Sequence, residues 1–426
     1  MDKIFDLITE EERYQSDTIR LIPSENFVSE NVKKALASDL TNKYAEGYPG
    51  RRYYQGNKIV DEIENLAIER GKKIFGVEHL NVQPYSGSPA NGAVLMALVE
   101  PGEKICGMKL SAGGHLTHGH PKITFSGKFF DSVQYDVDEE GRIDYEKLRE
   151  LVKAEKPKLI WAGTTAYPWI LDWKKFAEIA DEVGAWLVAD ISHIAGLIVG
   201  GVHPSPVPFV HIITSTTHKS LRGPRGAIIG ITAKGVSFAK GFGILDLSKL
   251  IDRAVFPGLQ GGPHMNTIAA MAVAFAEANT LEFKKYAEQV VKNAQALKRG
   301  LLVGNGRDGD EIIVGNGRDG DEIIVGNGRD RSVLKVNGNN AIRSGRIFGT
   351  ENHLMVVDCG LGKGKEVAIK LEEEGIIVNA NTIPHDQAGP FNPSGIRIGT
   401  PAMTTKGWKE KEFEEVGERI AKIILK

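Results

Sequence analysis

Residues 158–192 read KLIWAGTTAYPWILDWKKFAEIADEVGAWLVADIS, a stretch that holds an apolar run, a turn, an amphipathic segment and a second apolar run. The runs at 158–165 and 185–192 have the length and composition of buried strands, while 172–185 carries apolar residues at helical spacing. Another apolar run, FVHIITST, follows at 209–216. Strands that alternate with helices in this way predict an α/β fold with a mostly parallel sheet between helices.

Polar residues follow these expected strands at the point where each strand ends. They are Thr165, Asp190, His193, His218 and Lys219. Because ligands of such sheets collect at the carboxyl ends of the strands, we expect these side chains to surround a binding or active site.

Lys219 lies in TTHKSLRGPRG at 216–226, where two glycines and a proline exclude a helix or the middle of a strand. The segment is either a basic surface loop or a loop that holds a lysine as a nucleophile at the end of a buried strand. A buried lysine near other cations has a lowered pKa, and so has the neutral amine that Schiff-base formation needs.

A candidate phosphate site lies at residues 86–88, Ser-Gly-Ser, just before a helix whose first turn contains Pro89. Two hydroxyls and free backbone N–H groups at the positive end of a helix would suit an anion. Serine is also a common helix cap, so this segment alone does not separate a phosphate site from an ordinary cap.

Two further residues indicate which phosphate-containing ligand this site would bind. Asp190 ends an apolar strand and His115 lies in the glycine-rich SAGGHLTHGH, although a helix cap and a polar loop residue would explain each one separately. Taken with Lys219 and the Ser-Gly-Ser turn, they supply a carboxylate for a pyridinium nitrogen and a flat partner for its ring. This combination is the one that pyridoxal 5'-phosphate chemistry requires.

Composition narrows the classes of function. With 53 Lys and Arg against 55 Asp and Glu, the net charge of -2 offers no basic field for nucleic acid or for a membrane surface. Cys106 and Cys359 are too few for a disulfide framework or a metal site. The N-terminus lacks the layout of a secretory signal, and no apolar run reaches membrane-spanning length. We expect a cytoplasmic protein with small-molecule partners and no metal.

Long motifs then carry a family resemblance. They are LIPSENF (21–27), NKYAEGYPGRRYYQGN (42–57), NVQPYSGSPAN (81–91), GGHLTHGH (113–120), DISHIAGLIVGG (190–201), TSTTHKSLRGPRG (214–226), FPGLQGGPH (256–264) and SGIRIGTPAMTTKG (394–407). Their order and spacing resemble serine hydroxymethyltransferase, a fold-type I pyridoxal-phosphate family similar in fold to aspartate aminotransferase. The resemblance covers about residues 10 to 300 and again 349 to the end.

The resemblance implies a domain organisation. It divides the chain into an N-terminal arm with dimer contacts at 1–60, a large cofactor domain with a seven-stranded sheet at 61–278, and a small C-terminal α+β domain at 279–426.

The resemblance also implies roles for individual residues. Lys219 would carry pyridoxal 5'-phosphate as a covalent Schiff base (an aldimine), with His218 beside it and Asp190 on the pyridinium nitrogen. The other cofactor-binding residues would be Ser86, Gly87, Ser88, His115, Thr165 (where the family usually has serine), His193, and Gly261 and Gly262 from the neighbouring subunit.

Substrate residues follow from the same motifs. Arg397 would clamp the carboxylate of the amino acid, and Glu46 would act as acid or base during carbon transfer. Ser24, Tyr44 and Tyr54 would complete the serine site, with Tyr44 and Glu46 reaching in from the partner chain. The reduced pterin would contact Leu110, Gly114, His115, Leu116, Asn381, Gly389, Pro390 and Phe391.

The implied reaction is reversible transfer of the hydroxymethyl carbon of L-serine to tetrahydrofolate or a related pterin, giving glycine and 5,10-methylenetetrahydrofolate. The implied assembly is a homodimer with shared active sites, with a tetramer left open. A threonine aldolase of the same fold type would share Lys219 and Asp190 without needing a pterin. A catalytically silent binding or scaffold protein is the alternative from another class.

A tandem repeat does not match the family pattern. VGNGRDGDEII occurs at 303–313 and 314–324 and begins again at 325, so we expect most of 303–345 to be a surface insertion. Its Asn-Gly and Asp-Gly pairs favour short hairpins or a disordered loop over a helix. Acidic residues recur in its glycine-rich turns and could bind calcium through their oxygen atoms, but their spacing matches neither an EF-hand loop nor the nonapeptide repeat. They are Asp308, Asp310, Glu311, Asp319, Asp321 and Glu322.

Overall fold

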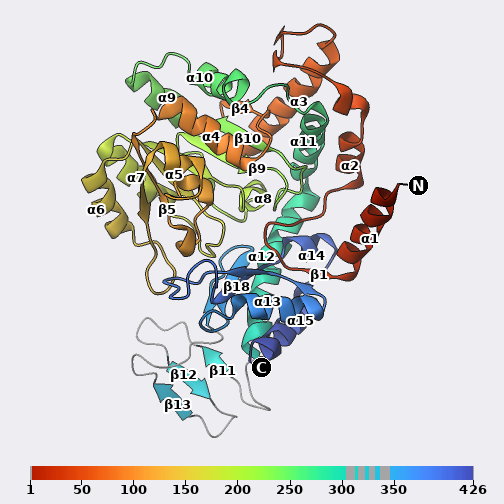
Figure 1. Cartoon of the computed structure of the whole chain (residues 1–426), viewed down its shortest axis with the longest axis vertical. Helices are drawn as coiled ribbons and strands as arrows, with labels where there is room; N and C mark the ends of the chain where they lie inside the picture. The colour runs from red at the N-terminus through yellow and green to blue at the C-terminus, as the bar shows by residue number, and fades with distance from the viewer. Residues whose placement is uncertain (1, 304–311, 315–321, 326–331, 336–345, 426) are drawn as a thin grey trace. The chain divides into compact units, whose positions relative to one another are not determined.

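The computed structural model describes residues 2–303, 312–314, 322–325, 332–335 and 346–425 (Figure 1). The chain forms two compact units, which we describe separately. The central unit comprises Ser24–Glu288, and the terminal unit combines Met1–Pro23 with Gln289–Lys426.

A seven-stranded sheet in the order β4-β10-β9-β8-β7-β5-β6 forms the middle of the central unit. The strands are β4 (His79–Asn81), β5 (Lys104–Met108), β6 (Asp131–Tyr135), β7 (Leu159–Gly163), β8 (Trp186–Asp190), β9 (Ile212–Thr216) and β10 (Ala227–Ile231). Neighbours from β6 to β9 are parallel, whereas β10 is antiparallel to both β9 and β4. The predicted strands at 158–165, 185–192 and 209–216 are confirmed as β7, β8 and β9, as is the mostly parallel sheet.

Helices surround this sheet (Figure 1). They are α2 (Glu30–Leu36), α3 (Lys58–Phe75), α4 (Gly87–Leu98), α5 (Phe125–Phe129), α6 (Tyr145–Glu155), α7 (Trp173–Val183), α8 (Ala195–Val199), α9 (Ala233–Gly241), α10 (Leu247–Arg253), α11 (Met265–Ala278) and the start of α12 (Leu281–Val303). Every residue of β7, β8, β9 and β10 is buried, which is typical of a sheet covered on both faces.

Helix α7 shows how the sequence sets these elements. Asp172 caps its N-terminus by accepting a hydrogen bond from the Lys175 N–H, and Gly184 ends it in the left-handed conformation. Its apolar face is buried, including Trp173 and Phe176. The helix predicted at 172–185 is therefore confirmed.

The terminal unit contains a four-stranded antiparallel sheet in the order β14-β15-β18-β17. Its elements are α1 (Lys3–Asp17), β1 (Ile19–Arg20), the rest of α12, β14 (Ile347–Phe348), β15 (Leu354–Asp358), α13 (Gly364–Glu373), β16 (Ile376–Ile377), β17 (Asn379–Asn381), β18 (Gly395–Gly399), α14 (Pro401–Thr405) and α15 (Glu410–Ile424). Its core packs Leu297, Ile398 and Phe413 together.

The grouping of the N-terminal residues differs from the expected division at 60 and 278. Strand β1 pairs with β16, and Leu21 is buried in the core of the terminal unit, so residues 1–23 group with the C-terminal part. Residues 24–60 group with the sheet of the central unit. The dimer contacts expected of residues 1–60 stay a prediction.

Only three short pieces of the repeat region are described. They are β11 (Ile312–Val314), β12 (Glu322–Val325) and β13 (Ser332–Lys335), which pair in antiparallel order. Antiparallel pairing is the arrangement that the turn pairs favour over a helix. Asp308, Asp310, Glu311, Asp319 and Asp321 lie outside the described residues, so the expectation about their role stays untested.

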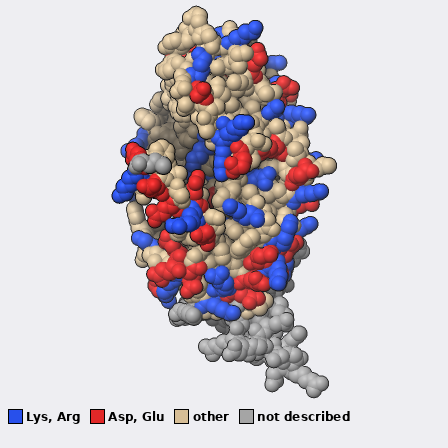
Figure 2. Space-filling view, turned by 90° about the vertical axis from the view of Figure 1, so that its right-hand side faces the viewer, with Lys and Arg blue, Asp and Glu red and all other residues tan. Residues whose placement is uncertain are grey.

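The remaining broad expectations concern surface and thiols. Within the described ranges, no helix is long and apolar enough to cross a membrane, and no cluster of His, Cys, Asp or Glu could hold a metal ion. Cys106 and Cys359 are buried and not joined in a disulfide. On the face shown in Figure 2, basic and acidic side chains are interspersed, in line with the net charge of -2.

Candidate active site

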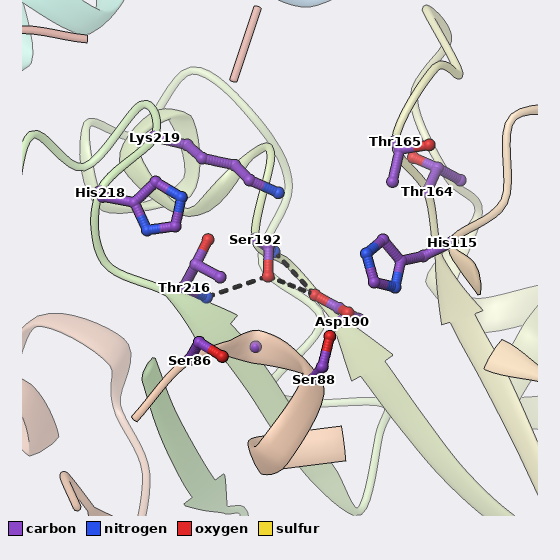
Figure 3. A pocket seen from close by; sticks show the side chains of 11 residues that line it. Ser86, Ser88, His115, Thr164, Thr165, Asp190, Ser192, Thr216, His218 and Lys219 are labelled. Atoms are coloured by element: carbon purple, nitrogen blue, oxygen red, sulfur yellow. Dashed lines mark hydrogen bonds between the residues drawn. The ribbon is translucent and has the colours of Figure 1, made fainter. Parts of the chain in front are cut away.

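A cavity of about 200 Å³ opens in the central unit where β7, β8 and β9 end and α4 begins (Figure 3). We call it the lysine cavity. It is lined by Ser86, Gly87, Ser88, His115, Thr164, Thr165, Asp190, Ser192, Thr216, His218 and Lys219. Most of the residues that the sequence placed at strand ends and at the Ser-Gly-Ser turn therefore meet around one space.

Lys219 and His218 follow β9 and lie on the side of the cavity opposite His115 (Figure 3). Burial, reinforced by the charges of Lys219 and Arg225, lowers the pKa of His218 to about 3. His218 is therefore neutral at neutral pH, and its Nδ1 is buried without a protein hydrogen-bond partner.

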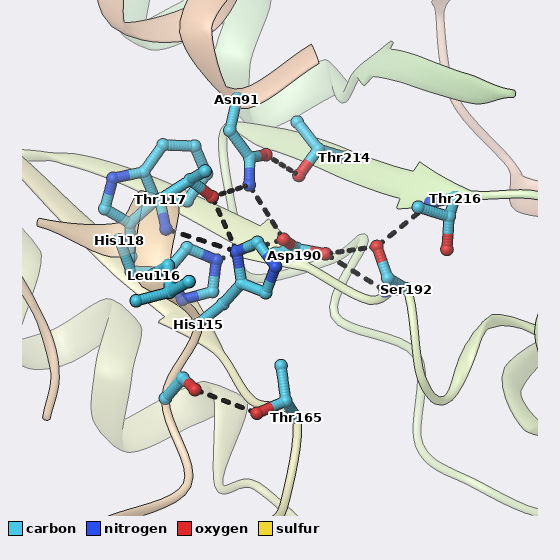
Figure 4. A network of polar contacts seen from close by, with 12 residues as sticks. Asn91, His115, Leu116, Thr117, His118, Thr165, Asp190, Ser192, Thr214 and Thr216 are labelled. Carbon is cyan, nitrogen blue, oxygen red and sulfur yellow. Dashed lines mark hydrogen bonds and ion pairs between the residues drawn. The ribbon is translucent and has the colours of Figure 1, made fainter. Parts of the chain in front are cut away.

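Asp190 is buried at the end of β8 and held by hydrogen bonds on both carboxylate oxygens (Figure 4). Its Oδ2 accepts from Asn91 Nδ2 at 2.9 Å and lies 3.0 Å from His118 Nε2, and its Oδ1 accepts from the Ser192 N–H and hydroxyl. Burial alone would raise the pKa of Asp190, but the His118 contact and the other hydrogen bonds hold it well below its usual range. The cavity thus contains a fixed negative charge.

His115 supplies a flat ring opposite the lysine (Figure 3). Burial lowers its pKa to about 4, and nearby His118 adds to this effect. Its Nδ1 lies 2.7 Å from Thr117 Oγ1, a contact that helps to fix the ring orientation. A neutral, oriented imidazole can stack on an aromatic ligand.

The start of α4 is open to an anion. Ser86 precedes the helix, but its hydroxyl makes no capping hydrogen bond. A Cβ at Gly87 would come within 2.8 Å of the Thr216 methyl group, so this turn approaches β9 more closely than a side chain allows. Thr216 Oγ1 is buried without a protein partner. The Ser86 hydroxyl, which does not cap the helix, and the buried Thr216 hydroxyl beside the start of α4 form a suitable phosphate cradle.

Thr165 is tied to the loop that carries His115. Its hydroxyl donates to the carbonyl oxygen of Gly114 at 2.8 Å (Figure 4). His193 lies after β8 and its carbonyl accepts from the Ser220 hydroxyl at 2.8 Å, although His193 does not line the cavity. Leu110 and Leu116 lie in short 3-10 turns on either side of Gly114, in the same loop.

Sequence reasoning missed several residues around Asp190 and the cradle. They are Asn91, His118, Thr164, Ser192 and Thr216. Thr164, Ser192 and Thr216 lie at or next to strand ends, so their positions were a usable signal. Asn91 and His118 contact Asp190 from distant parts of the chain, which no local pattern reveals.

A second group of predicted residues forms a separate cluster, Tyr44, Glu46, Tyr54, Gly261 and Gly262, which we call the hairpin cluster. The Tyr44 hydroxyl donates to Glu46 Oε1 at 3.1 Å, and the rings of Tyr44 and Tyr54 lie 5.1 Å apart. A Cβ at Gly261 would lie 3.4 Å from Glu46 Oε1, and one at Gly262 would lie 3.5 Å from the Tyr44 ring. None of the residues described as lining the lysine cavity belongs to this cluster.

The cluster is held by a small hairpin of β2 (Gly47–Tyr48) and β3 (Arg51–Arg52). The guanidinium of Arg52 donates to the carbonyls of Ala45 and Gly47 on either side of Glu46, and it pairs with Asp61 and Glu64. The backbone around Glu46 is therefore fixed within the single chain.

Other predicted residues belong to the terminal unit or lie apart from the cavity lining. Arg397 is in β18, where its Nε donates to Asn379 Oδ1 at 3.1 Å and burial lowers its pKa to about 10. Asn381 ends β17, and Phe391 is 95% exposed. Gly389, Pro390 and Phe391 lie in one loop before β18. Ser24 opens the central unit and does not line the cavity.

One cavity at the carboxyl edge of this sheet combines a lysine, a buried carboxylate, a neutral imidazole and a helix start that suits an anion. This combination defines a class of protein. The chain has the fold of a fold-type I pyridoxal-phosphate enzyme. The family model described as "Serine hydroxymethyltransferase" matches residues 1–342 and 332–420. The chain belongs to the serine hydroxymethyltransferase family.

Individual relatives agree with this assignment. The chain is 48% identical over 424 residues to a serine hydroxymethyltransferase of Desulfotalea psychrophila, an alignment that covers 99% of this chain and 88% of that protein. It is 49% identical over 424 residues to one of Acidothermus cellulolyticus, covering 99% of this chain and 87% of that protein. One of Lactobacillus gasseri is 48% identical over 425 residues, covering 99% and 92%.

Proposed function

We propose that this chain moves the hydroxymethyl carbon of L-serine to tetrahydrofolate, or to a related pterin, and leaves glycine and 5,10-methylenetetrahydrofolate. As a member of its family, the chain is a one-carbon transferase. The observation that carries the proposal is the lysine cavity, in which Lys219, Asp190 and His115 face one space beside the start of α4.

The cavity fits pyridoxal phosphate by its own chemistry. The Thr216 hydroxyl and His218 Nδ1 are buried without protein partners, and a Cβ at Gly87 would collide with the Thr216 methyl group, so the start of α4 lies close to the end of β9. When bound, this cofactor supplies an electron sink for negative charge that develops on the amino-acid Cα.

The residues predicted to bind the cofactor each have a proposed role toward it. Asp190 would hold a proton at the pyridine nitrogen, because its carboxylate is fixed and stays charged. His115 would cover one ring face, and the Lys219 amine would carry the cofactor covalently. Ser86, Gly87 and Ser88 would bind the phosphate, with Thr165, His193 and His218 near the ring substituents and Gly261 and Gly262 contributed by a partner chain.

Arg397 and the hairpin cluster have proposed tasks toward serine. The Arg397 guanidinium would bind the carboxylate through two parallel hydrogen bonds. Glu46 would take the proton of the serine hydroxyl and return it later, and its hydrogen bond from Tyr44 already orients the carboxyl group. Ser24 and Tyr54 would complete this site. The Cα–Cβ bond breaks, the carbon passes to the pterin with loss of water, and a proton on Cα gives glycine.

The pterin would lie against two loops. Leu110, Gly114, His115 and Leu116 come from the segment after β5, whereas Asn381 ends β17 and residues 389–391 lie in the loop between β17 and β18. The exposed ring of Phe391, with Pro390 beside it, gives this second loop a surface for a flat ligand.

We also propose a homodimer that shares its active sites, with a tetramer left open. The hairpin cluster is assembled and half-exposed in the single chain, yet its residues do not line that chain's lysine cavity. A partner chain that receives the cluster would complete the cavity. The proposal includes a cytoplasmic location, in line with two unpaired buried cysteines.

The function is tested by loading the protein with pyridoxal phosphate and measuring glycine formation from L-serine with and without tetrahydrofolate. The transferase requires the pterin, whereas a threonine aldolase cleaves threonine without it, and a binding protein does neither. Serine turnover unaffected by tetrahydrofolate would contradict the proposal. Arg397→Lys should raise the KM for serine about tenfold or more and leave the cofactor spectrum unchanged.

The repeat region has no proposed catalytic role. Lengthening a surface loop costs little, about 0.6 kcal/mol per doubling, so the fold should tolerate the insertion and its removal. Deleting residues 314–324, one complete repeat, should leave cofactor binding and turnover near wild type. Collapse of the terminal unit or loss of turnover would show that the repeat is part of the core or the site.

A further inference from the structure

The backbone of Lys219 is tied to a residue that lies far from it in the sequence. Its carbonyl oxygen accepts a hydrogen bond from Asn26 Nδ2 at 3.1 Å, across 193 positions, and another from the Arg222 N–H at 3.1 Å. Asn26 lies in the segment before α2. The carbonyl that follows the lysine side chain is thus held from outside its own loop.

Tyr286 in α12 completes the arrangement. Asn26 Nδ2 also donates to the Tyr286 hydroxyl at 2.8 Å, and this hydroxyl donates to the carbonyl of Ser220 at 3.3 Å. Asn26 Oδ1 accepts from the Phe27 N–H at 2.9 Å, which fixes the orientation of the amide. Two neighbouring carbonyls of the lysine turn are therefore bound by one Asn–Tyr pair.

Both partners of this pair are held in place. Tyr286 is 8% exposed, and the guanidinium of Arg222 lies 4.4 Å from the centre of its ring. Arg222 adopts a positive φ of 60°, an uncommon backbone conformation for a residue other than glycine. The turn therefore bends back so that its own arginine packs on the tyrosine that binds it.

The turn is also joined to the loop after β8. Ser220 Oγ donates to the carbonyl of His193 and accepts from the Gly196 N–H at 3.1 Å. Because Asp190 ends β8, these bonds link the backbone of the lysine to the element that carries the carboxylate.

We propose that Asn26 and Tyr286 are positioning residues that set where the Lys219 amine stands in the lysine cavity. The proposal rests on the proposed role of Lys219. A lysine side chain is long and flexible, so its amine can be placed only if its backbone is fixed, and an error of about 1 Å can cost roughly 100-fold in rate. Asn26 also lies two residues after Ser24, so the same pair couples the proposed serine segment to the lysine.

Tyr286→Phe tests this most cleanly, because it removes one oxygen atom and keeps the packed ring. We expect kcat to fall about tenfold, with slower capture of pyridoxal phosphate by the cofactor-free enzyme and a KM for serine within about twofold of wild type. The pH at which the bound cofactor changes its absorbance should shift, since the amine has moved. Asn26→Ala should act in the same direction, and the double variant should be little worse than either single one.

Tyr145→Phe is the matched control, because the Tyr145 hydroxyl accepts a hydrogen bond from the backbone N–H of Asp172, away from the lysine turn. It should leave kcat, capture rate and the pH midpoint unchanged. Tyr286→Phe with all three values at wild type would overturn the proposal, and so would a loss of kcat with an unchanged capture rate and midpoint. Borohydride reduction of the wild-type enzyme separates the two proposals: a label away from Lys219 removes the proposed function of Lys219 itself.

Discussion

The lysine cavity and the hairpin cluster differ in what surrounds them. The cavity residues Asp190 and Thr216 are buried, and their polar atoms are fixed or directed into one space. In the hairpin cluster, Tyr44 and Tyr54 are 55% and 48% exposed, although Glu46 is already hydrogen-bonded and its backbone is fixed by Arg52.

This contrast indicates a division of labour. One chain gathers most of the residues proposed to hold a cofactor around one cavity, and it separately orders a set of residues proposed to act on the substrate, none of which lines that cavity. Exposed tyrosines beside a fixed carboxylate are well suited to a surface that another chain covers. The predictions below test this division in order of decreasing effect.

Lys219→Ala should lower the turnover about 10⁴-fold or more, because the proposed role of Lys219 needs an amine that alanine lacks. Borohydride reduction of the loaded wild-type enzyme, followed by peptide mapping, should place the label on Lys219. Circular dichroism of the variant should match wild type. A label on another lysine would assign the cavity a different role.

Mixed dimers test whether the hairpin cluster serves a partner. Lys219→Ala and Glu46→Ala chains should each be inactive alone, whereas chains mixed in equal amounts and allowed to exchange should recover about a quarter of wild-type activity. Only a heterodimer contains one cavity with both native residues. If exchange is demonstrated and activity does not return, each chain uses its own Glu46.

The lysine cavity should also make stability depend on pH. Burial keeps His218 neutral, with a pKa of about 3 against 6.5 for the ordinary side chain. Between these values the unfolded chain binds a proton that the folded chain does not. The stabilisation is therefore complete above the pKa of His218 in the unfolded chain, and it is lost as the pH falls toward the pKa of His218 in the folded chain. The contribution of His218 amounts to about 2 kcal/mol between pH 7 and pH 5.

Urea unfolding of cofactor-free protein measures this effect. His218→Asn should lose about 2 kcal/mol less stability than wild type on going from pH 7 to pH 5. Tyr44→Phe is the control from the hairpin cluster. The hydrogen bond to Glu46 raises the pKa of Tyr44 above its ordinary value of 10, so this side chain does not titrate between pH 5 and pH 7. Identical pH profiles for His218→Asn and wild type would show that His218 is not held neutral.

Thr216→Val should produce the smallest effect. The substitution keeps the shape and removes a buried hydroxyl that has no protein partner, so the cofactor-free protein should be as stable as wild type or slightly more stable. Affinity for pyridoxal phosphate, measured by equilibrium titration, should fall about tenfold through loss of one bond to a charged group. Unchanged affinity would place the phosphate away from Thr216.

The sequence predicted the sheet well because its strands leave a strong local signal. β7, β8 and β9 are continuous apolar runs buried at every position, and α7 carries both a cap and a terminating glycine. Strand β1 has two residues, too few to show a pattern, so the grouping of residues 1–23 with the terminal unit could not be foreseen.

The site was predictable in the same uneven way. Asp190 ends β8, Lys219 follows β9, and the Ser-Gly-Ser turn begins α4, so the strand and helix boundaries indicated their positions. Asn91 points to Asp190 from inside α4, a helix of mostly apolar residues, where an asparagine could equally be a tolerated core amide. Its role depends on a partner in another strand. Tertiary packing decides such contacts.

The hydrogen bonds of the cavity also differ in the length of the chain segment between the two residues that each bond joins. The turn that carries Lys219 is tied by local contacts, such as Thr217 Oγ1 to the carbonyl of Pro224, seven positions away. The bonds that hold Asp190 span 72 positions to His118 and 99 to Asn91. Closing longer segments costs more chain entropy. The local bonds of the lysine turn can therefore form early in folding, whereas the bond from Asn26 to Lys219, across 193 positions, and the bonds from His118 and Asn91 to Asp190 need distant parts of the chain to come together. During synthesis and folding, a chain can thus possess a bent lysine loop before either the lysine backbone or the carboxylate is held in its final orientation.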